Sequence, residues 1–253
     1  MRHRIRTTLA LATAAAISAI LPFQTALAMT VQPVVIDLKT AGAGMSQVIT
    51  VENTFPTALP VEIGIQQLEL GNDGVKQTGQ DPGDLLVFPP QALIEPGQTQ
   101  TFRVQYVGDP ALDKSKHYYV TVAQLPIKLP EGQSAIQILY NFQVLVSVGP
   151  AGGKPKIVVD SAALGKNPAG KPIPLVTLHN ASPAHGYLAN GHLRVVERDP
   201  AGKELFARTL SGSEIQQTMG FGLIGGEQAR TVAVPLELPS DHGTVEASFT
   251  LDN

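Results

Sequence analysis

The chain has 253 residues, a formal net charge of −3, no cysteine and only 5% aromatic residues. A slightly acidic surface does not attract phosphates, which argues against nucleic acid as a partner. Without disulfides the fold must be held by packed cores, and the length suffices for two domains of ordinary size.

Residues 1–28 have the three parts of a secretory signal peptide. Three arginines among the first six residues precede an apolar run over 9–23, and Ala26-Leu27-Ala28 offers a cleavage point. The alternative, a membrane anchor, needs about 20 apolar residues, more than this run provides. We therefore expect cleavage between Ala28 and Met29, export of the mature chain, and no membrane insertion of that chain.

Residues 29–148 contain short segments of alternating apolar and polar residues, which is the pattern of half-buried β-strands. Turn residues separate them at 71–74 and 95–98, where glycine supplies a positive φ and proline a fixed one. Six such segments, together with a longer one after them, predict a seven-stranded immunoglobulin-like sandwich: 31–38, 47–51, 61–70, 85–88, 99–107 and 118–125.

The longer segment, 135–148, reads AIQILYNFQVLVSV, and every second residue from Ile136 to Val148 is apolar. It predicts one strand of roughly 46 Å at about 3.3 Å per residue, against a usual strand length of about 5–6 residues. Two interpretations remain open. All seven apolar side chains face the domain's own core, or only Val144, Val146 and Val148 do and the earlier part is offered to a partner.

A proline- and glycine-rich stretch over 149–155 follows the long segment and can support neither a helix nor a sheet ladder, so we expect a linker there. Residues 156–253 repeat the alternating style and predict a second immunoglobulin-like sandwich. No amphipathic helix of three turns is expected, and Ser211 is interpreted as a turn residue. The expected strands are 156–160, 175–179, 192–198, 205–210, 230–238 and 244–251.

Several segments of the first domain resemble the periplasmic pilus-assembly chaperones of the chaperone–usher pathway. The likeness is carried by the proline pair in Val87-Phe88-Pro89-Pro90, by Leu93-Ile94-Glu95-Pro96-Gly97-Gln98, by Gln100-Thr101-Phe102-Arg103-Val104, and by the Tyr118–Pro126 run before the long segment. The second domain shares weaker features over 177–183 and 224–231. The order and spacing of these pieces are more specific than any one of them, and they indicate a divergent member.

The resemblance implies two immunoglobulin-like domains set at an angle, a periplasmic location, no enzymatic activity and no cofactor. It also implies that the long strand is lent to pilus or fimbrial subunits that lack their own final strand, which is donor-strand complementation. The subunits would then pass to an outer-membrane usher. Carried onto this chain, the donor residues are Ile136, Ile138, Tyr140 and Phe142.

The chain departs from the family where an Arg on the first strand and a Lys on the last strand grip the subunit's C-terminal carboxylate. The matching positions are near Val34 and at Leu145, and neither is basic. Lys39 and Arg103 are the nearest basic candidates for such an anchor. An apolar donor edge is an aggregation hazard, so self-association of the free protein is a further expectation.

Two other classes of exported sandwich compete with this interpretation. A pilus subunit or adhesin would carry its donor segment at the mature N-terminus, and a carbohydrate-binding module would expose aromatic platforms, whereas this chain has no tryptophan. Catalysis and metal binding lack support, since His179, His185 and His192 have no clustered acids beside them. The Gly220–Gly225 match to a dinucleotide motif lacks its strand–turn–helix context.

Overall fold

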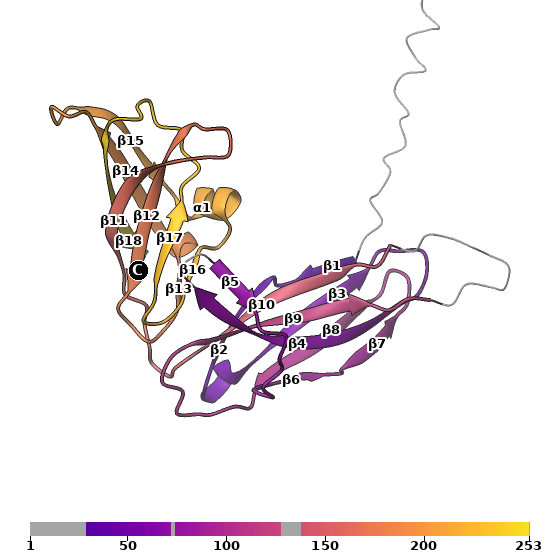
Figure 1. Cartoon of the computed structure of the whole chain (residues 1–253). Coiled ribbons are helices and arrows are strands. Elements are labelled where there is room, and N and C mark those ends of the chain that lie inside the picture. Colours follow the sequence, from indigo (N-terminus) through magenta and orange to yellow (C-terminus); the bar gives the residue numbers. More distant parts are fainter. Residues whose placement is uncertain (1–28, 72–73, 128–137, 253) are drawn as a thin grey trace, which may run out of the picture.

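The computed structural model describes residues 29–71, 74–127 and 138–252. They form two β-sandwich domains that meet at an angle, with the first domain next to the end of the second domain that carries β13 and β16 (Figure 1). The predicted signal peptide, residues 1–28, lies outside the described residues. Within the described ranges, no helix has the length and apolar character needed to span a bilayer.

Two sheets packed face to face make the first domain. One has the order β1-β3-β8-β6, and the other has the order β2-β10-β9-β4-β5, with β7 also pairing with β4. A short 3-10 turn, Gly42–Met45, links β2 to β3. The strands are β1 Met29–Gln32, β2 Val35–Lys39, β3 Ser46–Asn53, β4 Leu59–Gly71, β5 Gly74–Gln77, β6 Leu85–Phe88, β7 Gln91–Ile94, β8 Thr99–Tyr106, β9 Lys116–Gln124 and β10 Asn141–Gly149.

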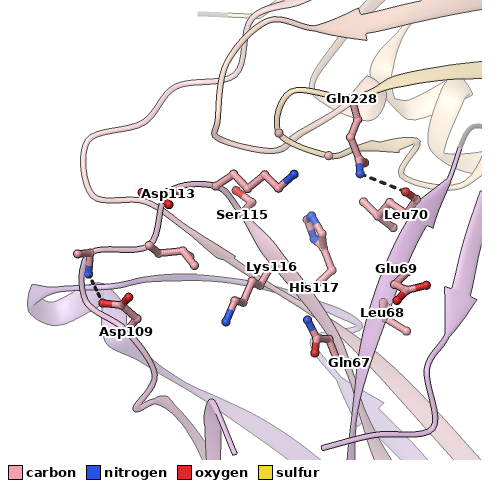
Figure 2. A pocket seen from close by; sticks show the side chains of 15 residues that line it. Gln67, Leu68, Glu69, Leu70, Asp109, Asp113, Ser115, Lys116, His117 and Gln228 are labelled. Atoms are coloured by element: carbon pink, nitrogen blue, oxygen red, sulfur yellow. Dashed lines mark hydrogen bonds between the residues drawn. The ribbon is translucent and has the colours of Figure 1, made fainter. Parts of the chain in front are cut away.

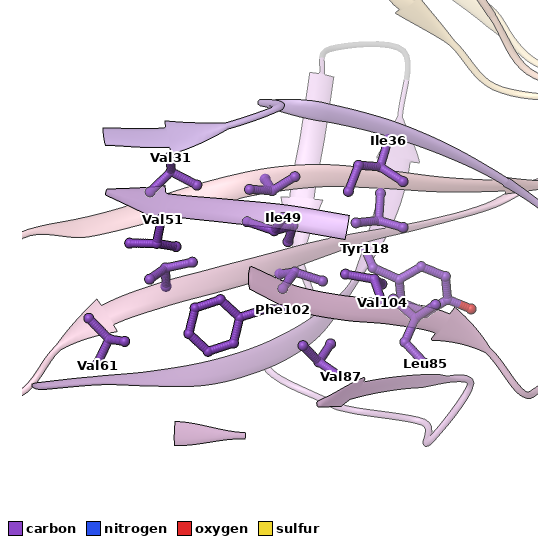
Figure 3. Packing of buried hydrophobic residues seen from close by; sticks show 14 of the residues in the cluster. Val31, Ile36, Ile49, Val51, Val61, Leu85, Val87, Phe102, Val104 and Tyr118 are labelled. Carbon is purple, nitrogen blue, oxygen red and sulfur yellow. The ribbon is translucent and has the colours of Figure 1, made fainter. Parts of the chain in front are cut away.

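Apolar side chains from both sheets fill the space between them (Figure 3). Phe102 and Tyr118 are fully buried, and Val144, Val146 and Val148 join them from β10. These three valines therefore face this domain's own core, as the alternation predicted. Their burial fixes the register of β10, because a one-residue slip would turn all of them to solvent.

In the first domain, two of the predicted strands are wrong in extent, and in the second domain the strand predicted over 156–160 runs to Lys166 while the one predicted over 230–238 ends at Ala233. The segment predicted over 31–38 is divided, because β1 pairs with β3 in one sheet and β2 pairs with β10 in the other, with Pro33 between them. Proline has no N–H for a ladder bond, so the change of sheet falls there. The long strand is shorter than predicted: β10 begins at Asn141, Ile138 to Tyr140 lie outside any strand, and Ile136 lies outside the described residues.

The second domain is built from three small antiparallel sheets around its own core. They are β11-β12-β17, β15-β14-β18 and the pair β13-β16. Leu178, Leu188, Leu193 and Ile215 are fully buried at its centre. The strands are β11 Ile157–Lys166, β12 Pro172–Asn180, β13 Gly186–Tyr187, β14 Gly191–Arg198, β15 Glu204–Leu210, β16 Leu223–Ile224, β17 Ala229–Ala233 and β18 Thr244–Leu251, with a 3-10 turn at Leu188–Asn190.

One short helix, α1 Gly212–Met219, follows β15. Ser211 is its N-cap and forms a capping box with Glu214, so the expectation of a simple turn at Ser211 is wrong. The S-x-x-E spacing was the available signal, and Ile215 buries the single apolar face of the helix against the core.

Candidate functional site

The first half of β10 is an open strand edge. On one side β9 pairs with β10 from Asn141 to Val148. On the other side β2 pairs in parallel only from Leu145 onward, where the Leu145 amide donates to the Val34 carbonyl at 3.0 Å. Among the described residues no strand lies beside this second edge over 141–144, because the chain crosses to the other sheet before Val34.

The main chain of this edge is oriented for pairing. The Leu145 amide points toward β2, and the N–H and C=O groups of a strand alternate sides with a period of two residues. Those of Asn141 and Gln143 therefore point the same way, beyond the end of β2. A row of unpaired amides and carbonyls is a template for an added strand.

Side-chain exposure falls steadily along this segment. Ile138 is 69% exposed and Tyr140 is 39% exposed, while Phe142 is half-buried against the first core and Val144 is 1% exposed. The Tyr140 ring rests against Phe55, with ring centroids 5.9 Å apart. Three of the four predicted donor residues thus run from solvent into the core beside the open edge.

The two basic candidates lie in different places. Lys39 ends β2 opposite Gly149 and lines a cavity of about 160 Å³ between the domains, together with Asp37 and His185. Arg103 lies on the outer face of the β1-β3-β8-β6 sheet, paired with Phe88 on one side and with Val48 on the other. It does not line that cavity.

A second group of polar residues joins the two domains. His185 and Tyr187 of the second domain both approach Asp37 of β2, at 2.8 Å from His185 Nε2 and 2.7 Å from the Tyr187 hydroxyl. The Tyr187 oxygen also lies 3.1 Å from Ser147 Oγ on β10. Burial acts to raise the pKa of Asp37, but the hydrogen bonds from His185 and Tyr187 and the charge of nearby Lys39 outweigh it and hold the pKa below its usual value.

Ser115 completes this group. Its Oγ lies 2.9 Å from His185 Nδ1 and also accepts a hydrogen bond from the His185 main-chain amide at 2.9 Å. The main-chain amide of Ser115 donates to the Pro183 carbonyl at 3.0 Å. Ser115, His185 and Asp37 therefore have the connectivity of a hydrolase triad. Because Ser115 is only 8% exposed and its oxygen is held by the His185 main chain, the arrangement works as a clamp between domains.

A larger cavity of about 480 Å³ lies on the other side of the junction (Figure 2). Its walls are the end of β4, residues 109–117 and the loop 225–228. Gln228 crosses between the domains here and donates to the Leu70 carbonyl at 3.1 Å. Charged side chains of both signs line it, among them Asp113, Lys114 and Lys116.

The three histidines singled out by sequence do not converge. His185 lies in the junction, His192 pairs with Asp252 at 2.7 Å on the surface, and His179 lies on β12. In the part of the chain that the structure describes, no group of three His, Cys, Asp or Glu side chains is placed to hold a metal.

Two immunoglobulin-like sandwiches at an angle, the first with an open edge beside exposed apolar side chains, define the class of two-domain β-sandwich chaperones. Residues 28–154 match the model of the family "Pili and flagellar-assembly chaperone, PapD N-terminal domain". The chain belongs to this family. No curated protein matches the sequence.

Solved structures share the whole architecture at low sequence identity. A chain from the chaperone–tip adhesin complex of CFA/I fimbriae biogenesis has a TM-score of 0.52 and 11% identity, covering 87% of this chain and 98% of its own. A chain of the CsuC–CsuE pre-assembly complex from Acinetobacter baumannii has a TM-score of 0.51 and 12% identity, covering 87% of this chain and 97% of its own. A chain of the Salmonella enterica SafA pilin–SafB chaperone complex has a TM-score of 0.51 and 13% identity, covering 90% of this chain and 97% of its own. At these identities the likeness is one of fold.

Sequence reasoning missed the junction residues Asp37, Ser147 and Tyr187. Asp37 and Ser147 occupy the polar positions of alternating strands, which ordinarily face solvent. The available signal was Gly186: a Cβ there would lie 2.6 Å from Pro155 Cβ, so glycine lets β13 approach the interdomain segment and brings Tyr187 to the junction.

Proposed function

We propose that this protein is a periplasmic chaperone that binds incomplete pilus or fimbrial subunits by donor-strand complementation. The observation that carries the proposal is the open edge of β10 over 141–144, flanked by exposed Ile138 and Tyr140. A sandwich that lacks one strand exposes both an unpaired edge and an apolar groove. A strand with free main-chain groups and apolar side chains pairs with the edge and fills the groove.

The side chains set the scale of the interaction. Full burial of one exposed large apolar side chain stabilises a complex by about 1.5–3 kcal/mol. Ile138 is 69% exposed and Tyr140 is 39% exposed in the free protein, so together they contribute a gross of about 1.5–3 kcal/mol. Phe142 adds less because it is already half-buried in the free protein. The entropy of association opposes this gain, so main-chain pairing along the edge is needed for a stable complex.

The remaining parts of the proposal rest on family membership. The chaperone is exported by its signal peptide, passes its subunits to an outer-membrane usher, and uses neither catalysis nor a cofactor. Ile136 extends the donor segment at its N-terminal end, and Lys39 is the candidate anchor for the subunit, since it lines the cavity at the domain junction. Arg103 faces another surface and is the weaker candidate.

The test is periplasmic co-expression with the pilin encoded nearest to the chaperone gene. We expect a one-to-one complex with the unaltered chaperone and its loss on Ile138→Asp with Tyr140→Asp, since charged side chains cannot enter an apolar groove. Leu205→Asp is the matched control, because Leu205 is 41% exposed on a strand of the second domain. Co-purification that survives the donor substitutions in a folded chaperone contradicts the proposal.

A further inference from the structure

Tyr187 lies where the second domain touches both strands that bound the open edge. Its side chain is buried, with 4% exposed. Its hydroxyl is 2.7 Å from Asp37 Oδ1 on β2 and 3.1 Å from Ser147 Oγ on β10. We propose that Tyr187 is a positioning residue, which fixes the pairing of β2 with β10 and so couples the length of the open edge to the angle between the domains.

The strand register supports this role. Asp37 and Ser147 are direct partners in the parallel ladder between β2 and β10. The ladder begins only two residues earlier, at Leu145 and Val35, which is where the open edge ends. Tyr187 therefore bridges a cross-strand pair next to the start of the ladder, at the point where fraying of β2 would lengthen the edge.

The hydrogens of the group can be assigned from its geometry. Asp37 is ionised and only accepts, so the Tyr187 O–H donates to it. The same Tyr187 hydroxyl also reaches Ser147 Oγ as a donor at 3.1 Å, so its hydrogen is shared between the two strands, and Ser147 Oγ lies 2.9 Å from His117 Nδ1. Burial lowers the pKa of His117 to about 3, in agreement with a neutral ring whose Nε2 has no hydrogen-bond partner among the described residues.

A second relay reaches the same carboxylate oxygen from the other side. Ser115 donates to His185 Nδ1, and His185 Nε2 donates to Asp37. The two relays begin on β9 and just before it, and both meet on β2 through side chains of the second domain. Rotation of the second domain away from the first would break the bonds to Asp37 and Ser147 together.

The consequence is a reciprocal coupling. If Tyr187 holds β2 against β10, then anything that turns the domains apart frees the β10 edge beyond Val144, and a strand bound along that edge favours one domain angle. This inference extends the proposed function, yet it concerns contacts within the free protein. Its test therefore needs no subunit.

The test compares Tyr187→Phe, which removes only the hydroxyl, with the unaltered protein. Two readouts are measured: amide hydrogen exchange over Leu145–Gly149, and the distance between spin labels placed by Thr101→Cys and Lys203→Cys, which is direct because the chain has no cysteine of its own. We expect exchange to rise about tenfold or more, since the lost bond is to a charged group, and the distance distribution to broaden. Exchange between β3 and β8 should stay unchanged.

Tyr106→Phe is the matched control, because its buried hydroxyl donates to Asp109 O within the first domain at 3.0 Å. It should leave both readouts at the unaltered values. Ser147→Ala removes the other end of the bridge and should raise exchange over Leu145–Gly149 to a lesser degree, which keeps the test available if Tyr187→Phe does not fold. A folded Tyr187→Phe protein with unchanged exchange and distances overturns the proposal, whereas failure to capture a pilin bears on the proposed function alone.

Discussion

Glu197→Gln should stabilise the second domain at neutral and alkaline pH. Glu197 lies on β14 between Phe206 of β15 and Val245 of β18, and it is fully buried. Neither carboxylate oxygen has a hydrogen-bond partner in the part of the chain that the structure describes. Burial raises the pKa of Glu197 above its usual 4.5, and the Ser240 backbone opposes this rise without reaching hydrogen-bonding geometry.

The sign of the effect follows from the raised pKa. The folded state favours the neutral acid, so the contribution of Glu197 to the free energy of unfolding is fully present below pH 4.5 and is lost as the pH rises through the pKa of the folded state. A buried polar group without a partner costs about 1–3 kcal/mol, and more when it is charged. Glutamine keeps the shape and one acceptor but cannot ionise, so we expect a gain of about 1–3 kcal/mol at pH 8 and none at pH 4.

Native-state hydrogen exchange of the β14 amides measures the free energy of unfolding of this domain alone, which avoids treating two domains as one transition. Glu246→Gln is the control, since Glu246 is exposed on the neighbouring β18 and pairs with Arg198 at 3.3 Å. That change should shift stability by less than about 0.5 kcal/mol. An equal effect of Glu197→Gln at pH 4 and pH 8 would refute the argument from a buried, ionisable carboxyl.

Three further outcomes are expected. Asn53→Ala should destabilise the first domain by about 3 kcal/mol in urea unfolding, because this buried side chain donates to two main-chain oxygens and accepts from a main-chain amide. Val146→Ala should cost about 2 kcal/mol in the same assay, whereas Ile138→Ala, at an exposed position, should cost less than about 0.5 kcal/mol. The pKa of Asp37 is lowered from 3.8, so the ionised carboxylate stabilises the domain junction above that pH, and this stabilisation is lost as the carboxylate is protonated. The distribution of spin-label distances should therefore broaden as the pH falls from 4 to 2.

The alternation of apolar residues predicted most of the strands. It works for residues such as Val144 and Val146, whose burial depends only on which face of a sheet they occupy. It overextended the long strand because periodicity does not say where a partner strand stops. Ile138 keeps the alternation of β10 but lies outside any strand, and only the path of the neighbouring chain decides this.

The sequence by itself determined the class of the protein: an all-β chain of two sandwiches, with the motif order of the pilus-chaperone family and an alternating apolar segment through Tyr140 and Phe142. These are local properties, written in spacing and side-chain type. The tertiary structure alone decided that Asp37, Ser147 and Tyr187 meet, because they are separated by more than a hundred residues or lie in different domains. It also decided how much of β10 is open, since that depends on where β2 leaves its neighbour.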